Sequence, residues 1–151
     1  MGPEILRKVP IVDELWHAGD WGDLHSTDGL LENIQIRGVY GNIDSSDVRA
    51  KYPKELFFEI DKLKVYMTHI GGYPGKYQKS VKERLIELKP DLFICGHSHI
   101  CRVMRDKQLN LIHFNPGAIG KHGFHSKRTM ITFKINNTII SDVKIHEYER
   151  N

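Results

Sequence analysis

The sequence lacks several features that would identify it as a secreted, disulfide-rich or membrane protein. It has only two cysteines among 151 residues, so no disulfide framework can be read from it, and a reduced, cytoplasmic setting is expected. No apolar run approaches the ~20 residues that a membrane-spanning helix needs. The first residues, Met1-Gly2-Pro3-Glu4, lack the basic start and apolar stretch of a secretory signal peptide. We therefore expect a cytoplasmic protein without a membrane partner.

An excess of charge of one sign is also missing. The chain carries 22 Lys and Arg against 19 Asp and Glu, a formal net charge of +3. This mild excess suits a small anionic substrate, whereas nucleic acid usually requires a clustered basic face, which the sequence does not indicate. No repeat, low-complexity tract or linker divides the chain. We expect one domain over residues 1–151, with a core large enough to fold without disulfides or other staples.

The order of the apolar segments indicates an α/β fold. Helices are expected over 2–8, 26–33 and 76–89, and in the last of these an apolar face at helical spacing precedes Pro90, formed by Val81, Leu85, Ile86 and Leu88. Helices mix with strands early and strands dominate late, which favours a two-layer or sandwich arrangement. The expected strands cover residues 9–17, 35–40, 56–60, 63–69, 91–95, 101–105, 110–115, 129–135 and 138–146.

Polar side chains of related chemistry follow four of the predicted strands: Asp20, Asn42, His69 and the pair His97 and His99. Because ligands of open α/β sheets gather beyond the carboxyl ends of strands, these residues could form one metal site. Neutral imidazoles suit zinc, iron, nickel and manganese, and an amide oxygen adds no negative charge. In an extended segment, His97 and His99 would project to the same side.

Each of these residues also has a simpler explanation when taken alone. Asp20 suits a turn or a helix cap, and Asn42 with Asp44 suits an Asx turn. His69 suits a hydrogen-bonded buried histidine, and the histidines of segment 96–99 suit a solvated loop. The joint pattern, with all of them at strand ends, favours the metal site.

In their order along the chain, these segments resemble the successive motifs of the calcineurin-like metallophosphoesterases. The resemblance implies an α/β sandwich of two mixed β-sheets flanked by helices, with a centre of two divalent transition metals (Mn, Ni, Fe or Zn). It also implies hydrolysis of a small phosphate ester, and in particular a diester, by a hydroxide that lies between the metals. The matching motifs are Gly19-Asp20, Gly41-Asn42-x-Asp44, Thr68-His69, Gly96-His97-Ser98-His99 and, for the small bacterial and archaeal phosphodiesterase branch, Asn115-Pro116-Gly117-Ala118.

The resemblance also implies a ligand set. One metal, at what we call the Asn42 position, would be held by Asn42, His69 and His97. The other, at the His99 position, would be held by His99, and Asp20 would bridge the two. Asp20 and Asn42 would thereby take part in catalysis, Asn42 beside the substrate phosphate.

The sequence departs from the family pattern at its start. The family opens with a strand that ends in Asp-x-His and supplies two further ligands, and no such motif precedes Asp20. The His99 position would then keep only two protein ligands, too few for tight binding when about four are usual. We expect an N-terminally truncated chain that lacks a central strand, and an uncovered sheet edge that favours self-association.

Several other residues are candidates with open alternatives. His125 and Arg128 could meet a substrate phosphate as charged hydrogen-bond donors, although a solvated basic loop explains them as well. Trp21 could wall the substrate site. His17 and His113 lie in apolar strands and are best explained as core or strand-edge residues.

Two functions remain compatible with the sequence. The first is a metal-dependent phosphodiesterase. The second is a non-catalytic scaffold or interaction protein on the same fold with impaired metal binding, as in the retromer subunit that resembles this family. The intact Asn42, His69, His97 and His99 favour the enzyme, while the absent Asp-x-His predicts reduced turnover.

Overall fold

A computed structural model describes residues 8–24 and 34–150 of the chain. The helices expected over 2–8 and 26–33 fall outside these residues, apart from Lys8. The remaining predicted elements are all present in the structure, with shifted ends, and one helix was not expected.

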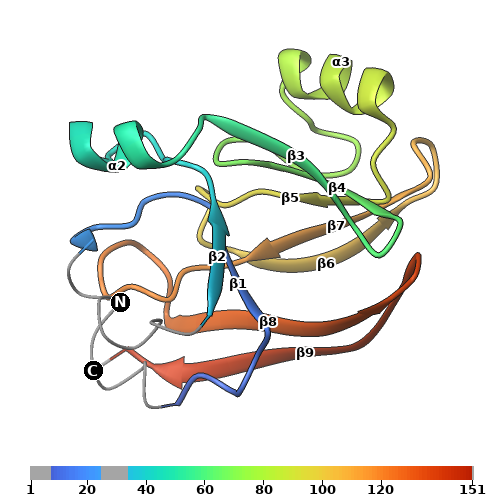
Figure 1. Cartoon of the computed structure of the whole chain (residues 1–151). Coiled ribbons are helices and arrows are strands. Elements are labelled where there is room, and N and C mark those ends of the chain that lie inside the picture. The colour runs from blue at the N-terminus through green and yellow to red at the C-terminus, as the bar shows by residue number, and fades with distance from the viewer. Residues whose placement is uncertain (1–7, 25–33, 151) are drawn as a thin grey trace.

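One layer of the fold is a five-stranded mixed sheet in the order β3-β4-β5-β7-β6 (Figure 1). Strands β4, β5 and β7 are parallel to one another, and the edge strands β3 and β6 are antiparallel to their neighbours. The central strands are buried on both faces, which explains their nearly continuous apolar sequences. The bounds are β3 Glu55–Ile60, β4 Leu63–Thr68, β5 Leu92–Ile94, β6 Cys101–Asp106 and β7 Leu111–Pro116.

Two smaller sheets form the second layer. The parallel pair is β1 (Glu14–His17) and β2 (Gln35–Gly38). The antiparallel pair is β8 (Lys127–Asn136) and β9 (Ile139–Glu149), joined by a turn in which Asn137 has a φ of 54°. The positive φ at Asn137 suits the gap expected between the strands over 129–135 and 138–146, because Asn tolerates this conformation in tight turns.

The core lies between the two layers. Val65, Met67 and Phe114 of the five-stranded sheet pack against Trp16 of β1 and Phe133 of β8. The Trp16 and Phe133 rings meet edge to face with centroids 5.4 Å apart. The predicted α/β class and layered arrangement are confirmed, with the second layer divided into two sheets.

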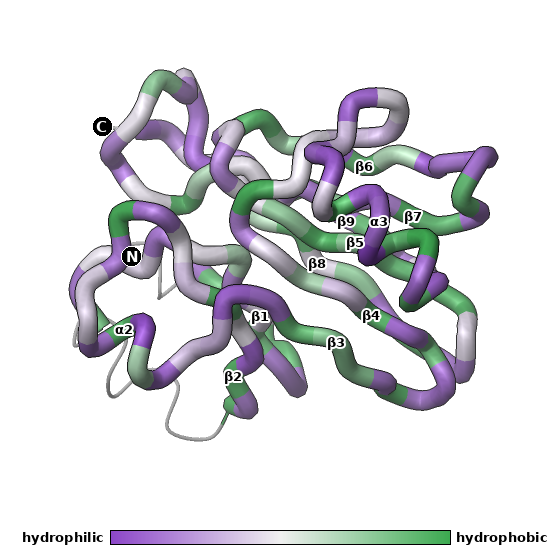
Figure 2. The backbone as a smooth tube through the Cα atoms, turned by 90° about the horizontal axis from the view of Figure 1, so that it is seen from above, coloured by the Kyte–Doolittle hydropathy of each residue, from purple (hydrophilic) through white to green (hydrophobic). Residues whose placement is uncertain are grey.

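Helix α3 (Lys79–Leu88) covers the other face of the five-stranded sheet (Figures 1 and 2). Its buried side chains Val81 and Leu85 pack against Tyr66 and Phe93, as the helical spacing predicted. Ile86, expected on the same face, is 52% exposed, so that part of the prediction is wrong. The helix ends at Lys89, which has a φ of 46°, directly before Pro90. Across the described residues, no helix has the length and apolar character needed to cross a membrane.

Two elements differ from the prediction. The strand expected over 9–17 is confined to Glu14–His17, since the segment before it contains Pro10, which cannot donate to a ladder. Helix α2 (Ser46–Lys51) was not expected, because its six residues with one buried side chain, Val48, leave no periodic pattern.

The two small sheets leave open edges toward each other. Among residues 8–24 and 34–150, β1 pairs only with β2, and β8 only with β9. A cavity of about 570 Å³ lies between them and is lined by residues of both β1 and β8.

His113 in β7 predicts how stability depends on pH. The ring is fully buried beside Phe93, with centroids 5.3 Å apart, and burial lowers its pKa to about 4. Its unfolded pKa is about 6.5, so the unfolded chain binds the proton first and stability falls as pH drops from 6.5 toward 4. We expect a contribution of about 2 kcal/mol between pH 7 and pH 5.

Urea unfolding of the wild type and of His113→Phe at both pH values measures this contribution. Desolvation also lowers the pKa of His17, which is partly buried, to about 4, so the variant should keep part of the pH dependence. An equal loss of stability in both proteins on acidification would contradict the prediction.

Candidate metal centre

Three of the candidate ligands lie in loops with an unfavourable backbone conformation. Asp20, His97 and His99 have φ values of 60°, 64° and 57°. Residues with a side chain seldom adopt this left-handed region, and such conformations persist only where the surrounding structure fixes them. The contacts that fix these loops are therefore part of the site.

The buried carboxylate of Asp44 fixes Asp20 beside Asn42. It accepts hydrogen bonds from the backbone N–H groups of Gly41 (2.6 Å), Trp21 (2.7 Å) and Asp20 (2.9 Å). The loops that follow β1 and β2 are thus joined through one side chain. A Cβ at Gly41 would collide with the Asp20 carboxylate, so glycine is needed there for close approach.

His69, at the end of β4, has a fixed ring orientation. Its buried Nδ1 lies 2.6 Å from the carbonyl oxygen of Ala18, to which it donates. In this tautomer Nε2 has a free lone pair, and it lies 3.1 Å from Asn42 Oδ1 and 3.2 Å from Asp20 Oδ2.

His97 completes this group of side chains. Its Nδ1 lies 3.1 Å from Asn42 Oδ1, and one ligand atom each from Asp20, His69 and His97 lie within 4.8 Å of one another. Asn42 Oδ1, Asp20 Oδ2 and His69 Nε2 all offer lone pairs to the same space. A cation would relieve this crowding of acceptors, and carboxylate, amide and imidazole suit a divalent transition metal. These residues therefore fit a divalent transition metal at the Asn42 position.

Asn115 holds the loop that carries His97 and His99. Its buried side chain donates to the Gly96 carbonyl (2.8 Å) and to Ser98 Oγ (3.1 Å). The loop is not extended, because both histidines have positive φ. The extended conformation expected for His97 and His99 is therefore wrong, although both side chains line the polar end of the cavity.

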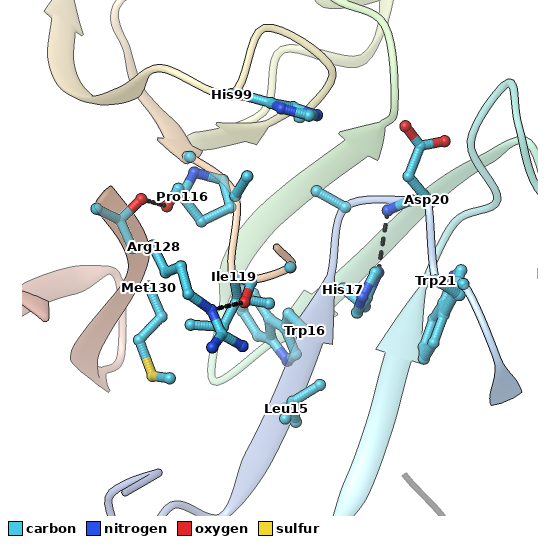
Figure 3. A pocket seen from close by; sticks show the side chains of 18 of the residues that line it. Leu15, Trp16, His17, Asp20, Trp21, His99, Pro116, Ile119, Arg128 and Met130 are labelled. Atoms are coloured by element: carbon cyan, nitrogen blue, oxygen red, sulfur yellow. Dashed lines mark hydrogen bonds between the residues drawn. The ribbon is translucent and has the colours of Figure 1, made fainter. Parts of the chain in front are cut away.

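His99 lies apart from the Asp20, His69 and His97 group. Its ring packs edge to face against His125, with centroids 5.1 Å apart. Partial burial and the neighbouring His125 lower the His99 pKa, while Asp20 opposes this shift. Figure 3 shows His99 and Asp20 at the same end of the cavity, with the His99 ring directed toward Asp20.

The cavity between β1 and β8 has an apolar body and a polar end (Figure 3). Leu15, Trp16 and Met130 line the body, and Asp20, His69, His97 and His99 line the polar end. A ligand with an apolar part and a group that binds metal would match this division.

The structure buries both residues predicted to meet phosphate. Arg128 is 1% exposed and its Nε donates to the Ile119 carbonyl at 2.7 Å. His125 is 9% exposed and its Nε2 lies 3.0 Å from the Gly120 carbonyl. Only Arg128 of the two lines the cavity. Their contact with substrate stays a prediction.

Trp21 is a core residue. It is 5% exposed and stacked between His17 and Tyr52, with ring centroids 3.9 and 4.0 Å away. Its Nε1 donates to the Val39 carbonyl at 2.9 Å. It supports the Asp20 loop and also lines the cavity, so its contact with substrate stays a prediction. His17, which stacks on it, is partly buried and also lines the cavity.

Asp44 and Asn115 are the site residues that the sequence did not single out. Both belong to motifs of the family resemblance, Gly41-Asn42-x-Asp44 and Asn115-Pro116-Gly117-Ala118, but the motifs alone indicated no role for either. The signal was the position of Asp44, two residues after Asn42, in a segment where a carboxylate can accept several backbone N–H groups.

Comparisons with known proteins agree with this arrangement. Residues 3–138 match the family model of the calcineurin-like phosphoesterase superfamily domain. A "Probable metallophosphoesterase" of Methanothermobacter thermautotrophicus is 32% identical over 112 residues, which cover 71% of this chain and 60% of that protein. The chain thus spans about 60% of the length of the curated relative it matches.

Solved structures of similar fold include Vps29 of Entamoeba histolytica complexed with Zn²⁺. Its TM-score is 0.73 at 15% identity, with 100% of this chain and 91% of that chain covered. A conserved uncharacterized protein of Streptococcus pneumoniae, described as a predicted phosphoesterase, has a TM-score of 0.66 at 22% identity, with 99% and 84% covered. At these identities the likeness shows the fold alone.

Proposed function

The chain belongs to the calcineurin-like phosphoesterase superfamily, and from this premise we propose that it is a metal-dependent phosphodiesterase acting on a small phosphate ester. The observation that carries the proposal is the convergence of Asn42, His69 and His97 on Asp20, from loops after four separate strands. These residues are distant in sequence, yet their lone-pair-bearing atoms lie close together. This favours a metal centre over the alternative that each residue serves only in a turn or in the core.

The ligand types support a different role for each residue. Asp20, which has two carboxylate oxygens, would bridge the Asn42 and His99 positions. Asn42 would hold its metal through a neutral oxygen, so an anionic phosphate meets less repulsion. A divalent metal bound there would supply Lewis-acid chemistry, lowering the pKa of water and neutralising charge on phosphate oxygens.

The chain's own contribution is orientation. His69 is fixed by the Ala18 carbonyl, and Asp20 by Asp44, so the ligand atoms are held in place before substrate binds. The apolar body of the cavity would receive the ester substituent and limit water around the phosphate. Ile43 is exposed beside the site, and its side chain has no proton to give to a leaving group. Esters with good leaving groups should therefore react faster than esters with poor ones.

The metals proposed are Mn, Ni, Fe or Zn, two in number, with weaker binding at the His99 position. The similar Vps29 structure is described as a complex with Zn²⁺, which supports a transition metal here. The ligand types alone do not favour one of these four ions.

The proposal includes a cytoplasmic location and one domain over residues 1–151. Cys95 and Cys101 are both free thiols, which suits a reducing compartment. Burial raises the pKa of Cys95 to about 12, so it is not a nucleophile. The open edges of β1 and β8 offer a route to self-association.

Hydrolysis by metal-depleted and metal-restored protein tests the proposal. The chelated full chain should be inactive toward bis-p-nitrophenyl phosphate and should recover turnover with Mn²⁺ or another of the four ions. Activity toward the monoester p-nitrophenyl phosphate should be lower. Weak metal binding without hydrolysis of either ester would favour the scaffold function instead, and preference for the monoester would exclude a phosphodiesterase.

A further inference from the structure

We propose that His125 is a positioning residue for His99. In this inference, His125 Nδ1 accepts a hydrogen bond from His99 Nδ1 and so directs His99 Nε2 toward Asp20 and the His99 metal position. The inference rests on the proposed function, because it concerns the second metal position of the same centre.

The environment of His125 leaves one ring nitrogen without a partner. The side chain is 9% exposed, and Nε2 is engaged by the Gly120 carbonyl at 3.0 Å, so Nε2 carries the proton. Nδ1 is then a bare acceptor, and it is buried with no hydrogen-bond partner in the described structure. A buried acceptor without a partner has lost its hydrogen bonds to water, so a nearby donor would be bound strongly.

His99 is the neighbour that can supply this donor. Both Nδ1 atoms lie next to Gly123. A Cβ added at Gly123 would have His99 Nδ1 as its nearest neighbour and would lie 3.0 Å from His125 Nδ1. The two nitrogens therefore border the same small space, which is open because residue 123 is glycine. Rotation of these rings would let His99 Nδ1 donate to His125 Nδ1.

The resulting chain of contacts repeats the arrangement seen at His69. There, Nδ1 donates directly to the Ala18 carbonyl, and Nε2 faces the Asn42 position. At His99, the Gly120 carbonyl would act through His125. Metal-binding histidines usually donate their second N–H to such an acceptor, which fixes both the tautomer and the ring orientation.

A neutral acceptor suits this position. Asp20 already brings a negative charge to the polar end of the cavity, and a neutral imidazole fixes the tautomer without adding another. With so few protein ligands at the His99 position, the orientation of His99 should matter strongly for metal affinity. Positioning also explains why His125 is buried and does not line the cavity, which a phosphate-binding role does not.

Metal titrations of variants in the full chain test the inference. His125→Leu removes the acceptor, whereas the amide of His125→Gln can accept from His99 and still donate to Gly120. We expect Co²⁺ binding to the wild type in two classes of site. His125→Leu should weaken the second class by about 10–100-fold and change its visible spectrum, His125→Gln should restore most of the affinity, and the first class should not change.

Nitrogen NMR of the wild type gives a second measurement that needs no variant. We expect His99 to carry its proton on Nδ1 and His125 on Nε2. A His99 protonated on Nε2 would overturn the inference, as would unchanged Co²⁺ binding in a folded His125→Leu.

The outcomes also separate this inference from the proposed function. If His125→Leu weakens inhibition by inorganic phosphate but leaves both metal classes intact, His125 binds substrate and the inference is wrong. If the wild type binds no metal and hydrolyses no ester, the proposed function itself fails. Metal-dependent hydrolysis with one metal class insensitive to His125 would overturn only the inference.

Discussion

Replacing His97 by alanine should remove the metal from the Asn42 position and, with it, phosphodiester hydrolysis. His97 contributes one of the nitrogens that face Asn42 Oδ1, 3.1 Å away. Loss of an outer partner of a metal ligand already costs 10–100-fold in affinity, so loss of a direct ligand should cost at least about 100-fold. Turnover of bis-p-nitrophenyl phosphate should fall to the level of the chelated protein.

The fold should survive this change, because His97 is exposed and its loop is held by Asn115. Thermal unfolding of the metal-free wild type and variant should therefore agree. His146→Ala is the matched control, since it also removes an imidazole but lies on β9, where His146 contacts Thr132. Wild-type metal affinity in His97→Ala would show that the centre lies elsewhere.

The sequence predicted the layers of the fold because its apolar pattern is strong where burial is complete. The β3–β4 hairpin around Asp61-Lys62 and the apolar face of α3 both follow from periodicity alone. The same reasoning failed for α2, whose six residues bury only Val48. It also could not show that the second layer is divided, since pairing between strands depends on which edges meet in space.

The sequence predicted which residues form the candidate site, but it did not predict how they are arranged. Asp20, Asn42, His69 and His97 come together as polar residues at strand ends were expected to do. The left-handed backbone of His97 and His99 was not foreseen, because their spacing was interpreted for an extended segment. That conformation is imposed by distant contacts such as those of Asn115, which local spacing cannot reveal.

Asp44 is a second residue whose role depends on distant contacts that the sequence does not reveal. Its place in Gly41-Asn42-x-Asp44 suggests a local turn, and its bond to Gly41 is indeed local. The bonds to Asp20 and Trp21 join residues 24 and 23 positions apart and exist only because β1 and β2 are adjacent and parallel. The residue therefore links strand pairing to the position of a metal ligand.

Replacing Asp44 by asparagine should accordingly damage both stability and the metal centre. The carboxylate accepts from three backbone N–H groups, on Gly41, Asp20 and Trp21. An amide has the same shape, but its NH₂ group must face at least one of these donors, which leaves buried polar groups unsatisfied. We expect a loss of about 3 kcal/mol in the free energy of unfolding, measured by urea denaturation of the metal-free protein.

Metal affinity at the Asn42 position should fall as well, because Asp20 and Asn42 lose the contact that holds their loops together. Asp47→Asn is the matched control: Asp47 is exposed in the first turn of α2, so both its stability and its metal binding should stay near those of the wild type. If Asp44→Asn bound metal normally while losing stability, Asp44 would be a folding residue only. Since Asp20 depends on Asp44 for its left-handed backbone, we expect both losses to appear together.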